Sequence, residues 1–176
     1  MAASPLRPRK KTMSSSTPEL TAAVITVSDS CARGERTDTS GPAVAELLRK
    51  YRFVIAGNAI VSDDQPAIEN VLLSWMGKAR LVVTTGGTGI APRDVTPEAT
   101  RAVCDRLLEG ISERMRTEGA KKTPLAALSR ALCGARGTSL LLNLPGSPAG
   151  AIESLQSVIE ILPHALQLLE GNTHHG

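Results

Sequence analysis

Short hydrophobic runs alternate with segments of helical periodicity along most of this chain. Each run is short and rich in Val, Ile and Leu, which is typical of strands buried in a sheet. The segments between them place apolar residues three or four apart, which is typical of amphipathic helices. Runs that predict strands cover residues 22–28, 53–60, 81–85 and 138–144. Periodic segments predict helices over 40–51, 63–76, 149–169 and from 96 onward, while 110–137 is predicted to be irregular with helical pieces.

The expected helix starts carry recognisable capping residues. Ser40 precedes Gly-Pro and is expected to cap the first helix, with the proline in the first turn. Asp63-Asp64-Gln-Pro opens the second helix, and Thr96-Pro-Glu opens the third. In the last helix Pro163 removes a backbone donor, so we expect a kink or a split there.

Strands that alternate with helices predict βαβ units and therefore an α/β fold. We expect a three-layer sandwich, with a mostly parallel central sheet and right-handed crossovers that place helices on both faces. Residues 21–176 are expected to form one domain, preceded by a disordered basic tail over 1–20. In such sheets ligands bind beyond the carboxyl ends of the strands, so that edge is where chemistry is expected.

Composition and charge narrow the class of protein. Hydrophobic residues make up 41% of the 176 residues but aromatic residues only 2%, so the core must be aliphatic. The formal net charge of +3 resides in the first twenty residues, which leaves 16 basic and 16 acidic residues in the remainder. Residues 21–176 therefore carry no net charge, which gives no reason to expect nucleic-acid binding.

Cysteine usage and hydropathy indicate the compartment. Cys31, Cys104 and Cys133 are odd in number and far apart, which argues against a disulfide framework or a zinc site. No run approaches the ~18 apolar residues of a membrane span, and the first twenty residues lack the apolar stretch of a secretory signal. We therefore expect a cytoplasmic protein without a membrane segment.

Residues capable of chemistry gather at the predicted carboxyl ends of four strands. Glycine-rich backbone in front of a helix can bring its N–H groups close to a phosphate. The glycine-rich segment after the predicted strand 81–85, Gly86-Gly-Thr-Gly89, lacks the Gly-Lys-Ser/Thr of a Walker loop. Pro92 stands where the dinucleotide fingerprint has its last Gly or Ala. The glycines are therefore compatible either with phosphate binding or with a tight strand-to-helix turn. The four sets are Ser28-Asp29-Ser30, Ser62-Asp63-Asp64, Gly86-Gly87-Thr88-Gly89 followed by Arg93-Asp94, and Asn143-Leu-Pro145-Gly146-Ser147.

Carboxylates at two of these ends form a candidate metal site. Polyphosphate chemistry needs a divalent cation, and Mg²⁺ prefers oxygen ligands. Asp63, Asp64 and Asp94 are the candidate ligands. The alternative for Asp63 or Asp64 is helix capping, and the alternative for Asp94 is a turn residue paired with Arg93.

Four motifs together resemble the molybdopterin adenylyltransferase family, which includes bacterial Mog-type proteins and the N-terminal domain of gephyrin. The resemblance extends from about residue 21 to about residue 170. The motifs are Thr26-Val-Ser-Asp-Ser30, Thr84-Thr-Gly-Gly-Thr-Gly89, Pro92-Arg-Asp-Val-Thr-Pro-Glu-Ala-Thr100 and Asn143-Leu-Pro-Gly-Ser147.

The resemblance implies a reaction and its components. The family transfers AMP from ATP to the terminal phosphate of molybdopterin with Mg²⁺, releases pyrophosphate, forms trimers and supplies a molybdenum insertase. Its essential carboxylates correspond to Asp63 and Asp94. Carried over as nucleotide- and phosphate-binding residues are Gly86, Gly87, Thr88, Gly89, Asn143, Pro145, Gly146 and Ser147. Carried over as substrate-binding residues are Ser28, Asp29, Ser30, Ser129 and Arg130.

Two alternatives remain open on this fold. A sister branch, often called molybdenum cofactor protein B, keeps the glycine loop but in some members lacks the aspartates. This chain keeps Asp63 and Asp94, which favours the catalytic type over a non-catalytic molybdopterin-binding or assembly protein. The other alternative is a different nucleotide-handling enzyme with the same domain, similar to the competence-damage proteins. Those proteins are usually longer and carry extra domains, so a length of 176 residues counts against this alternative. The chain departs from the family pattern at Ser62, where proline is common, and at Asp64, where glutamate is common.

Overall fold

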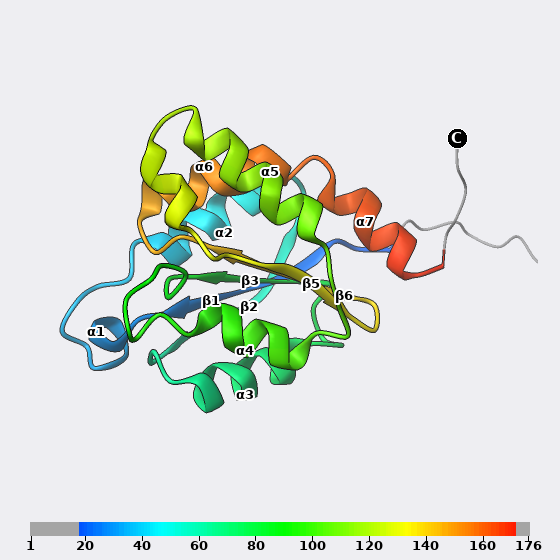
Figure 1. Cartoon of the computed structure of the whole chain (residues 1–176). Coiled ribbons are helices and arrows are strands. Elements are labelled where there is room, and N and C mark those ends of the chain that lie inside the picture. Colours follow the sequence, from blue (N-terminus) through cyan, green and yellow to red (C-terminus); the bar gives the residue numbers. More distant parts are fainter. Residues whose placement is uncertain (1–17, 172–176) are drawn as a thin grey trace, which may run out of the picture.

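A mixed sheet forms the centre of the computed structural model, which describes residues 18–171. Residues 1–17 of the tail predicted over 1–20, and residues 172–176, lie outside the described part. Leu20, at the end of the predicted tail, packs against the core, and its carbonyl oxygen accepts from the N–H of Val54 at 2.8 Å. Within the described part the sheet has six strands in the order β2-β1-β3-β6-β5-β4 (Figure 1). The strands are β1 (Thr21–Val27), β2 (Val54–Val61), β3 (Leu81–Thr85), β4 (Arg106–Leu107), β5 (Cys133–Arg136) and β6 (Ser139–Leu144).

Four neighbouring strands, β2, β1, β3 and β6, are parallel, as the alternating pattern predicted. β1 pairs in parallel with β2 and β3, and β3 pairs in parallel with β6. Only β5 runs against its neighbours β6 and β4. The carboxyl ends of β1, β2, β3 and β6 therefore lie on the same edge of the sheet.

Helices cover both faces of the sheet, which confirms the three-layer prediction (Figure 1). One face carries α2 (Ser40–Lys50), α5 (Glu109–Ala120), α6 (Pro148–Val158) and α7 (Leu162–Leu169). The other face carries α3 (Gln65–Trp75) and α4 (Thr96–Val103). Two short elements, α1 (Asp29–Ala32) and the 3₁₀ helix η1 (Pro124–Leu128), lie in connections.

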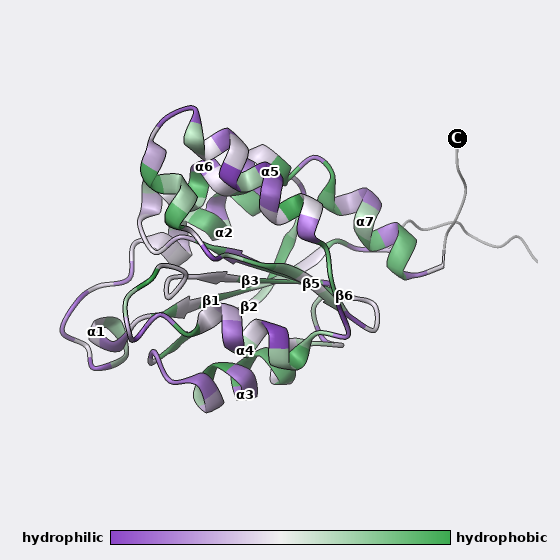
Figure 2. Ribbon diagram, viewed as in Figure 1, coloured by the Kyte–Doolittle hydropathy of each residue, from purple (hydrophilic) through white to green (hydrophobic). Residues whose placement is uncertain are grey.

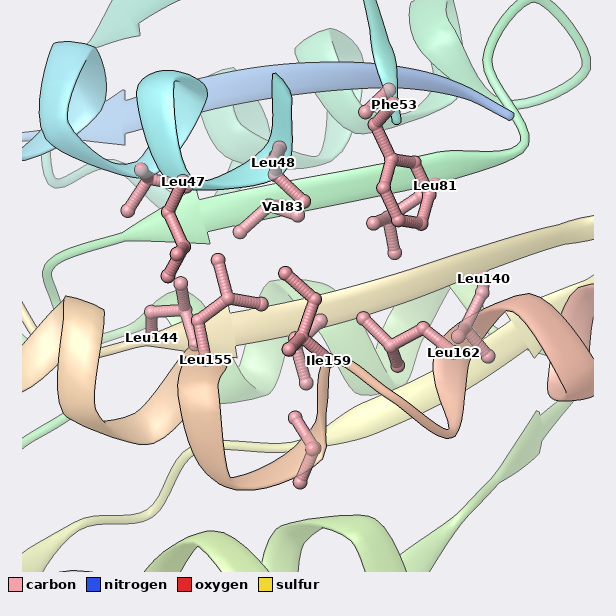
Figure 3. Packing of buried hydrophobic residues seen from close by; sticks show 14 of the residues in the cluster. Leu47, Leu48, Phe53, Leu81, Val83, Leu140, Leu144, Leu155, Ile159 and Leu162 are labelled. Carbon is pink, nitrogen blue, oxygen red and sulfur yellow. The ribbon is translucent and has the colours of Figure 1, made fainter. Parts of the chain in front are cut away.

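Alternation within the strands builds two separate cores. Along β1, Ala22 and Val24 pack toward α2 and α6, whereas Ala23 and Ile25 pack toward α3 and α4. Side chains that point to opposite faces in turn explain why these strands are hydrophobic throughout. Figure 2 shows apolar strands beneath helices whose outer faces are polar. In Figure 3, Leu155, Ile159 and Leu162 lie against the strand residues Leu140 and Leu144.

β2, an edge strand, is irregular near Gly57. Ala22 pairs with Ile55 and the next residue, Ala23, pairs with Gly57, so one residue of β2 bulges out. A Cβ on Gly57 would lie 2.2 Å from the Trp75 ring. The glycine thus makes room for the only tryptophan of the chain, which packs from α3 against the core.

Several element ends and one region differ from the sequence predictions. α2 begins after Thr39, so Ser40 lies inside the helix and does not cap it. The cap acceptor is Asp38, whose Oδ1 accepts from the N–H of Gly41 at 3.0 Å.

The region over 110–137, predicted to be irregular, contains most of the twelve-residue α5 and the strand β5. α5 buries only Ile111, Ser112 and Met115, so its apolar periodicity is weak, and its burial depends on neighbours distant in sequence. The split at Pro163 is confirmed, since α6 and α7 are separate helices.

No helix in residues 18–171 combines the length and the apolar character needed to cross a membrane.

Candidate active site

The glycine loop after β3 lies at the carboxyl edge of the sheet, where it is fixed from both sides. The N–H of Gly86 donates to the carbonyl oxygen of Leu144 at 3.0 Å. The hydroxyl of Thr96 donates to the carbonyl oxygen of Gly86 at 2.9 Å. Gly86 has a φ of +98°, and a Cβ there would lie 2.3 Å from the carbonyl oxygen of Val27. Only glycine therefore allows the loop to lie this close to β1.

Backbone donors gather beside this loop. Among the described residues, the N–H groups of Gly87, Thr88 and Gly89 have no protein acceptor, and neither do those of Gly146 and Ser147. The latter two lie at the amino end of α6, where Ser147 accepts from the N–H of Gly150 at 3.2 Å. Unpaired donors at a helix start form a binding site for an anion such as phosphate.

Two hollows meet at these donors. One has a volume of about 500 Å³ and the other about 590 Å³. Both are lined by Gly87, Asp94, Gly146 and Ser147. The first is largely apolar and is lined further by Thr88, Gly89, Met115, Arg116, Leu125, Leu128, Ser129 and Pro145. The second, called the polar hollow below, has the larger polar share of the two and is lined further by Thr26, Ser28, Arg36, Asp38, Ser40, Asp63, Thr85 and Gly86.

The two predicted catalytic carboxylates flank the glycine loop. Asp63 follows β2, and its Oδ1 would lie 3.2 Å from a Cβ on Gly87. Asp94 lies in the segment after the loop, and its Oδ2 would lie 2.8 Å from a Cβ on Gly89. Asp94 Oδ2 also accepts from the N–H of Ala91 at 2.9 Å. Both side chains are half-buried at the place where the hollows meet.

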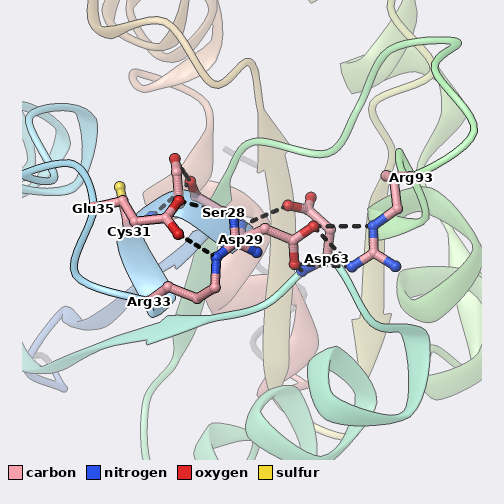
Figure 4. A network of polar contacts seen from close by, with 8 residues as sticks. Ser28, Asp29, Cys31, Arg33, Glu35, Asp63 and Arg93 are labelled. Carbon is pink, nitrogen blue, oxygen red and sulfur yellow. Dashed lines mark hydrogen bonds and ion pairs between the residues drawn. The ribbon is translucent and has the colours of Figure 1, made fainter.

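Asp63 is held by Asp29. The N–H of Asp29 donates to Asp63 Oδ2 at 2.8 Å, and the N–H of Asp63 donates to Asp29 Oδ1 at 3.0 Å (Figure 4). The pKa of the Asp63 carboxyl is raised, mainly because the group is partly buried. The negative charges of Asp29 and Asp94 also raise this pKa, whereas the hydrogen bond from the N–H of Asp29 lowers it. The bonded Arg93 guanidinium lowers the pKa of Asp29. Asp29 therefore stays ionised more readily than Asp63.

Asp64 takes the capping role that the sequence left open as an alternative. Its Oδ2 accepts from the N–H of Ala67 at 3.0 Å, which makes it the N-cap of α3. The side chain is exposed and lines neither hollow. This geometry favours the capping alternative for Asp64 over the predicted role as a metal ligand, because the carboxylate bonds to the helix start and not to the loop.

Asn143 also differs from its predicted role. Its side chain is fully buried beneath the sheet edge and lines neither hollow. The Nδ2 atom donates to Thr84 at 3.0 Å and to Thr100 at 2.8 Å, while Oδ1 accepts from the N–H of Leu132 at 3.1 Å. With donors and acceptor occupied by protein groups, Asn143 supports the site from below instead of binding a nucleotide directly.

Arg130 holds the glycine loop in place. Its Nε donates to the carbonyl oxygen of Gly89 at 2.7 Å, its Nη2 donates to the carbonyl oxygen of Asp94 at 2.6 Å, and it forms an ion pair with Glu98. The structure therefore gives Arg130 a role in holding the loop, whereas its predicted contact with substrate stays a prediction. Ser129, its neighbour, does line the apolar hollow.

Of the three residues predicted at the end of β1, only Ser28 lines a hollow. Ser28 lines the polar hollow and caps α1, since its Oγ accepts from the N–H of Cys31 at 3.3 Å. Ser30 Oγ lies 3.2 Å from Ser28 Oγ, and neither Ser30 nor Asp29 lines a hollow.

Two of the lining residues that the sequence did not single out carry charge, namely Asp38 and Arg116. Asp38 accepts from the hydroxyl of Thr26 at 2.6 Å as well as from Gly41, and so it joins β1 to α2 under the polar hollow. Its position three residues before the first bonded N–H of a helix is a capping signal that could have identified it. Arg116 contributes a guanidinium to the apolar hollow, and its position on the weakly periodic α5 gave no such signal.

The donor set fits Mg²⁺. Among residues 18–171 no group of three or more His, Cys, Asp or Glu side chains converges as a metal cage. Mg²⁺, however, usually binds one or two carboxylates together with substrate phosphates and water. Asp63 and Asp94 beside unpaired N–H donors provide such an arrangement.

Comparisons with known proteins identify the family. Residues 23–164 match the family model described as a probable molybdopterin binding domain. A molybdopterin adenylyltransferase of Helicobacter pylori is 41% identical over 153 residues, which cover 85% of this chain and 87% of that protein. The Drosophila melanogaster protein named molybdenum cofactor synthesis protein cinnamon is 42% identical over 154 residues, which cover 85% of this chain but only 26% of that protein.

A similar solved structure supports the same family assignment. The molybdopterin biosynthesis enzyme MoaB of Thermus thermophilus is 50% identical, with a TM-score of 0.82, 86% of this chain covered and 97% of that chain. The chain belongs to the molybdopterin-binding domain family that includes the molybdopterin adenylyltransferases.

Proposed function

We propose that this protein transfers AMP from ATP to the terminal phosphate of molybdopterin, in a Mg²⁺-dependent reaction that releases pyrophosphate. The observation that carries the proposal is the junction of the two hollows, where unpaired backbone N–H groups lie between Asp63 and Asp94. Two substrates whose phosphates must meet need such an arrangement. Relatives named molybdopterin adenylyltransferase, 36% to 41% identical, support the same reaction.

The proposed step joins two phosphates. An oxygen of the molybdopterin phosphate attacks the α-phosphorus of ATP, and the bond between that phosphorus and the bridging oxygen of the β-phosphate breaks. Pyrophosphate leaves with the electron pair, and the new phosphoanhydride holds AMP on molybdopterin. The N–H groups of Gly87, Thr88 and Gly89, together with those of Gly146 and Ser147, would bind the phosphate oxygens and stabilise charge that develops on them.

Asp63 and Asp94 are the residues that would hold Mg²⁺. Their carboxylates face the loop, whereas Asp64 does not. When bound, the ion would reduce repulsion between the two phosphates and stabilise the departing pyrophosphate. Asp63 has one oxygen bonded to Asp29 N–H, and its other oxygen faces Gly87, so the free oxygen is the one available as a ligand.

The substrates would occupy the hollows with their phosphates at the shared junction. The apolar hollow offers Met115, Leu125 and Leu128 for stacking or packing against a ring system. The polar hollow offers Thr26, Ser28 and Ser40 for hydroxyl and phosphate groups.

Partners and location are part of the proposal. The chain matches 26% of cinnamon, 22% of a Dictyostelium discoideum gephyrin and 49% of a Chlorobaculum tepidum protein named molybdenum cofactor biosynthesis bifunctional protein. In these relatives the domain is joined to further chain, which supports transfer of the product to a molybdenum insertase. We further propose a homotrimer, on the family resemblance, and a reducing compartment such as the cytoplasm, because all three cysteines are free thiols.

A non-catalytic molybdopterin-binding or assembly protein is the second candidate. The 50% identity with a protein named MoaB favours it, since the sister branch carries that name. The retention of both Asp63 and Asp94 beside the phosphate-binding backbone favours the enzyme.

The test is incubation of the purified chain with molybdopterin, ATP and Mg²⁺, followed by detection of adenylated molybdopterin and pyrophosphate in stoichiometric amounts. Pyrophosphate without adenylated product would indicate simple ATP hydrolysis and contradict the proposal. Tight binding of molybdopterin with neither product would support the second candidate.

A further inference from the structure

We propose that Asp29 and Arg93 form a positioning pair that fixes the separation of Asp63 and Asp94. The inference rests on the proposed function only in naming these two carboxylates as the ones that must be held. Asp29 lies after β1, Asp63 after β2, and Arg93 directly before Asp94 in the segment after β3. Three strand ends are therefore joined by the contacts of one carboxylate.

Asp29 holds Asp63 through both its backbone and its side chain. Its N–H donates to Asp63 Oδ2 at 2.8 Å, and its Oδ1 accepts from the N–H of Asp63 at 3.0 Å. The Asp63 carboxylate cannot rotate without breaking the first bond. Its Oδ1 is directed toward Gly87, 3.2 Å from the position that a Cβ would take there.

Arg93 holds Asp29 with a two-point contact. Its Nε donates to Asp29 Oδ2 at 2.9 Å, and its Nη2 donates to Asp29 Oδ1 at 2.8 Å. The dashed lines of Figure 4 join Asp29 both to Asp63 and to Arg93. A guanidinium bound at two points fixes orientation as well as distance, which a single ammonium contact does not do. Since Asp94 follows Arg93, the segment that carries Asp94 is tied through Asp29 to Asp63.

The pair is suited to positioning more than to stability. The Arg93 side chain is 63% exposed, and exposed ion pairs contribute little to the free energy of unfolding. The Asp29–Arg93 pair instead fixes positions, because the two carboxylates that hold one ion must keep a fixed separation. A shift of about 1 Å in a reacting group can cost ~10²-fold in rate.

A double-mutant cycle tests the pair, with Asp29→Asn, Arg93→Ala and the combined variant. Asparagine keeps an acceptor for the N–H of Asp63 but loses the charge that binds Arg93. The first readout is the Kd of Mn²⁺ in the presence of a non-hydrolysable ATP analogue, measured by electron paramagnetic resonance. The second is the split between kcat and KM in the adenylation assay.

Each single substitution is expected to raise the Kd of Mn²⁺ and to lower kcat about tenfold, with KM for molybdopterin changed less than about twofold. The combined variant should be no worse than either single variant, because both break one connection. Arg93→Lys should restore only part of the loss. Effects that multiply in the combined variant would mean that Arg93 contacts substrate directly, and an unchanged Kd of Mn²⁺ would mean that the pair positions nothing. Either result overturns the proposal.

Arg33→Ala is the matched control. Arg33 forms a similarly exposed two-point pair with Glu35 on the same segment, 59% exposed, but does not bond to Asp29 or Asp63. It should leave both readouts unchanged. If the wild-type protein formed no adenylated product, the proposed function would fail, while the Mn²⁺ titration would still decide the positioning role.

Discussion

Arg130 donates from its Nε to the carbonyl oxygen of Gly89 across 2.7 Å, so a residue before β5 fixes the last glycine of the loop after β3. The N–H of Arg130 donates as well, to the carbonyl oxygen of Thr88 at 2.8 Å. Orientation of the unpaired N–H groups thus depends on a side chain 41 residues away.

Arg130→Ala is expected to loosen this loop. Loss of a charged donor to the partly buried carbonyl groups of Gly89 and Asp94 should lower the free energy of unfolding by about 2 kcal/mol. Loss of loop order should lower kcat of adenylation ~10-fold or more, since the donors would no longer be preorganised. Denaturant titration and steady-state kinetics measure the two effects. Arg114→Ala, which removes an exposed bond from Arg114 Nε on α5 to the carbonyl oxygen of Ser157 in α6, should leave kcat unchanged.

Asp63→Asn and Asp94→Asn should each reduce ATP-dependent adenylation by ~10²-fold or more, because the neutral amide is a weaker ligand for Mg²⁺. Binding of molybdopterin should survive, and removal of Mg²⁺ from the wild-type protein should have the same effect as either substitution. Turnover and equilibrium binding are the measurements. Near-normal turnover with normal Mg²⁺ dependence in either variant would show that the residue is structural only.

Asp64→Ala tests whether Asp64 only caps α3 or also binds Mg²⁺ together with Asp63. Loss of the acceptor for the N–H of Ala67 should lower the free energy of unfolding by about 1 kcal/mol, and Asp64→Ser should recover most of it. Neither substitution should change the Mg²⁺ concentration needed for half-maximal rate. A clear increase in that concentration for the serine variant would restore Asp64 to the metal site.

Asn143→Ala should be among the more destabilising substitutions. It leaves the N–H of Leu132 and the hydroxyls of Thr84 and Thr100 without their partner in a fully buried place, at a cost of about 3 kcal/mol. The folded fraction should still bind ATP with near-normal Kd, as measured by calorimetry at low temperature. Normal stability with lost nucleotide binding would indicate direct contact with substrate.

The buried thiols should make the protein less stable in alkali. Burial raises the pKa of Cys104 to about 11 and that of Cys133 to about 12, from an ordinary value of 9.0. The unfolded chain therefore loses these protons first, so the free energy of unfolding should fall as pH rises above about 9. Replacing both cysteines with alanine should flatten this dependence between pH 9 and pH 11 in denaturant titrations. An unchanged slope would show that other groups cause it.

The sequence determined the layers and the site edge. Hydrophobic runs such as Leu81–Thr85, buried on both faces, are typical of parallel strands between helices, and the capping residue Asp64 marks the start of α3. The glycine loop, Asp63 and Asp94 could also be identified, because parallel strands bring their carboxyl ends to one edge.

Only the tertiary structure decided which of these residues face the hollows. Asn143, Asp64 and Arg130 carry suitable groups, but whether an amide, a carboxylate or a guanidinium is available for a ligand depends on what else bonds to it. Asn143 is occupied by Thr84 and Thr100, which arrive from other elements. Hydrogen bonds are short-range and directional, so their partners depend on packing between segments distant in sequence, and no local pattern encodes them.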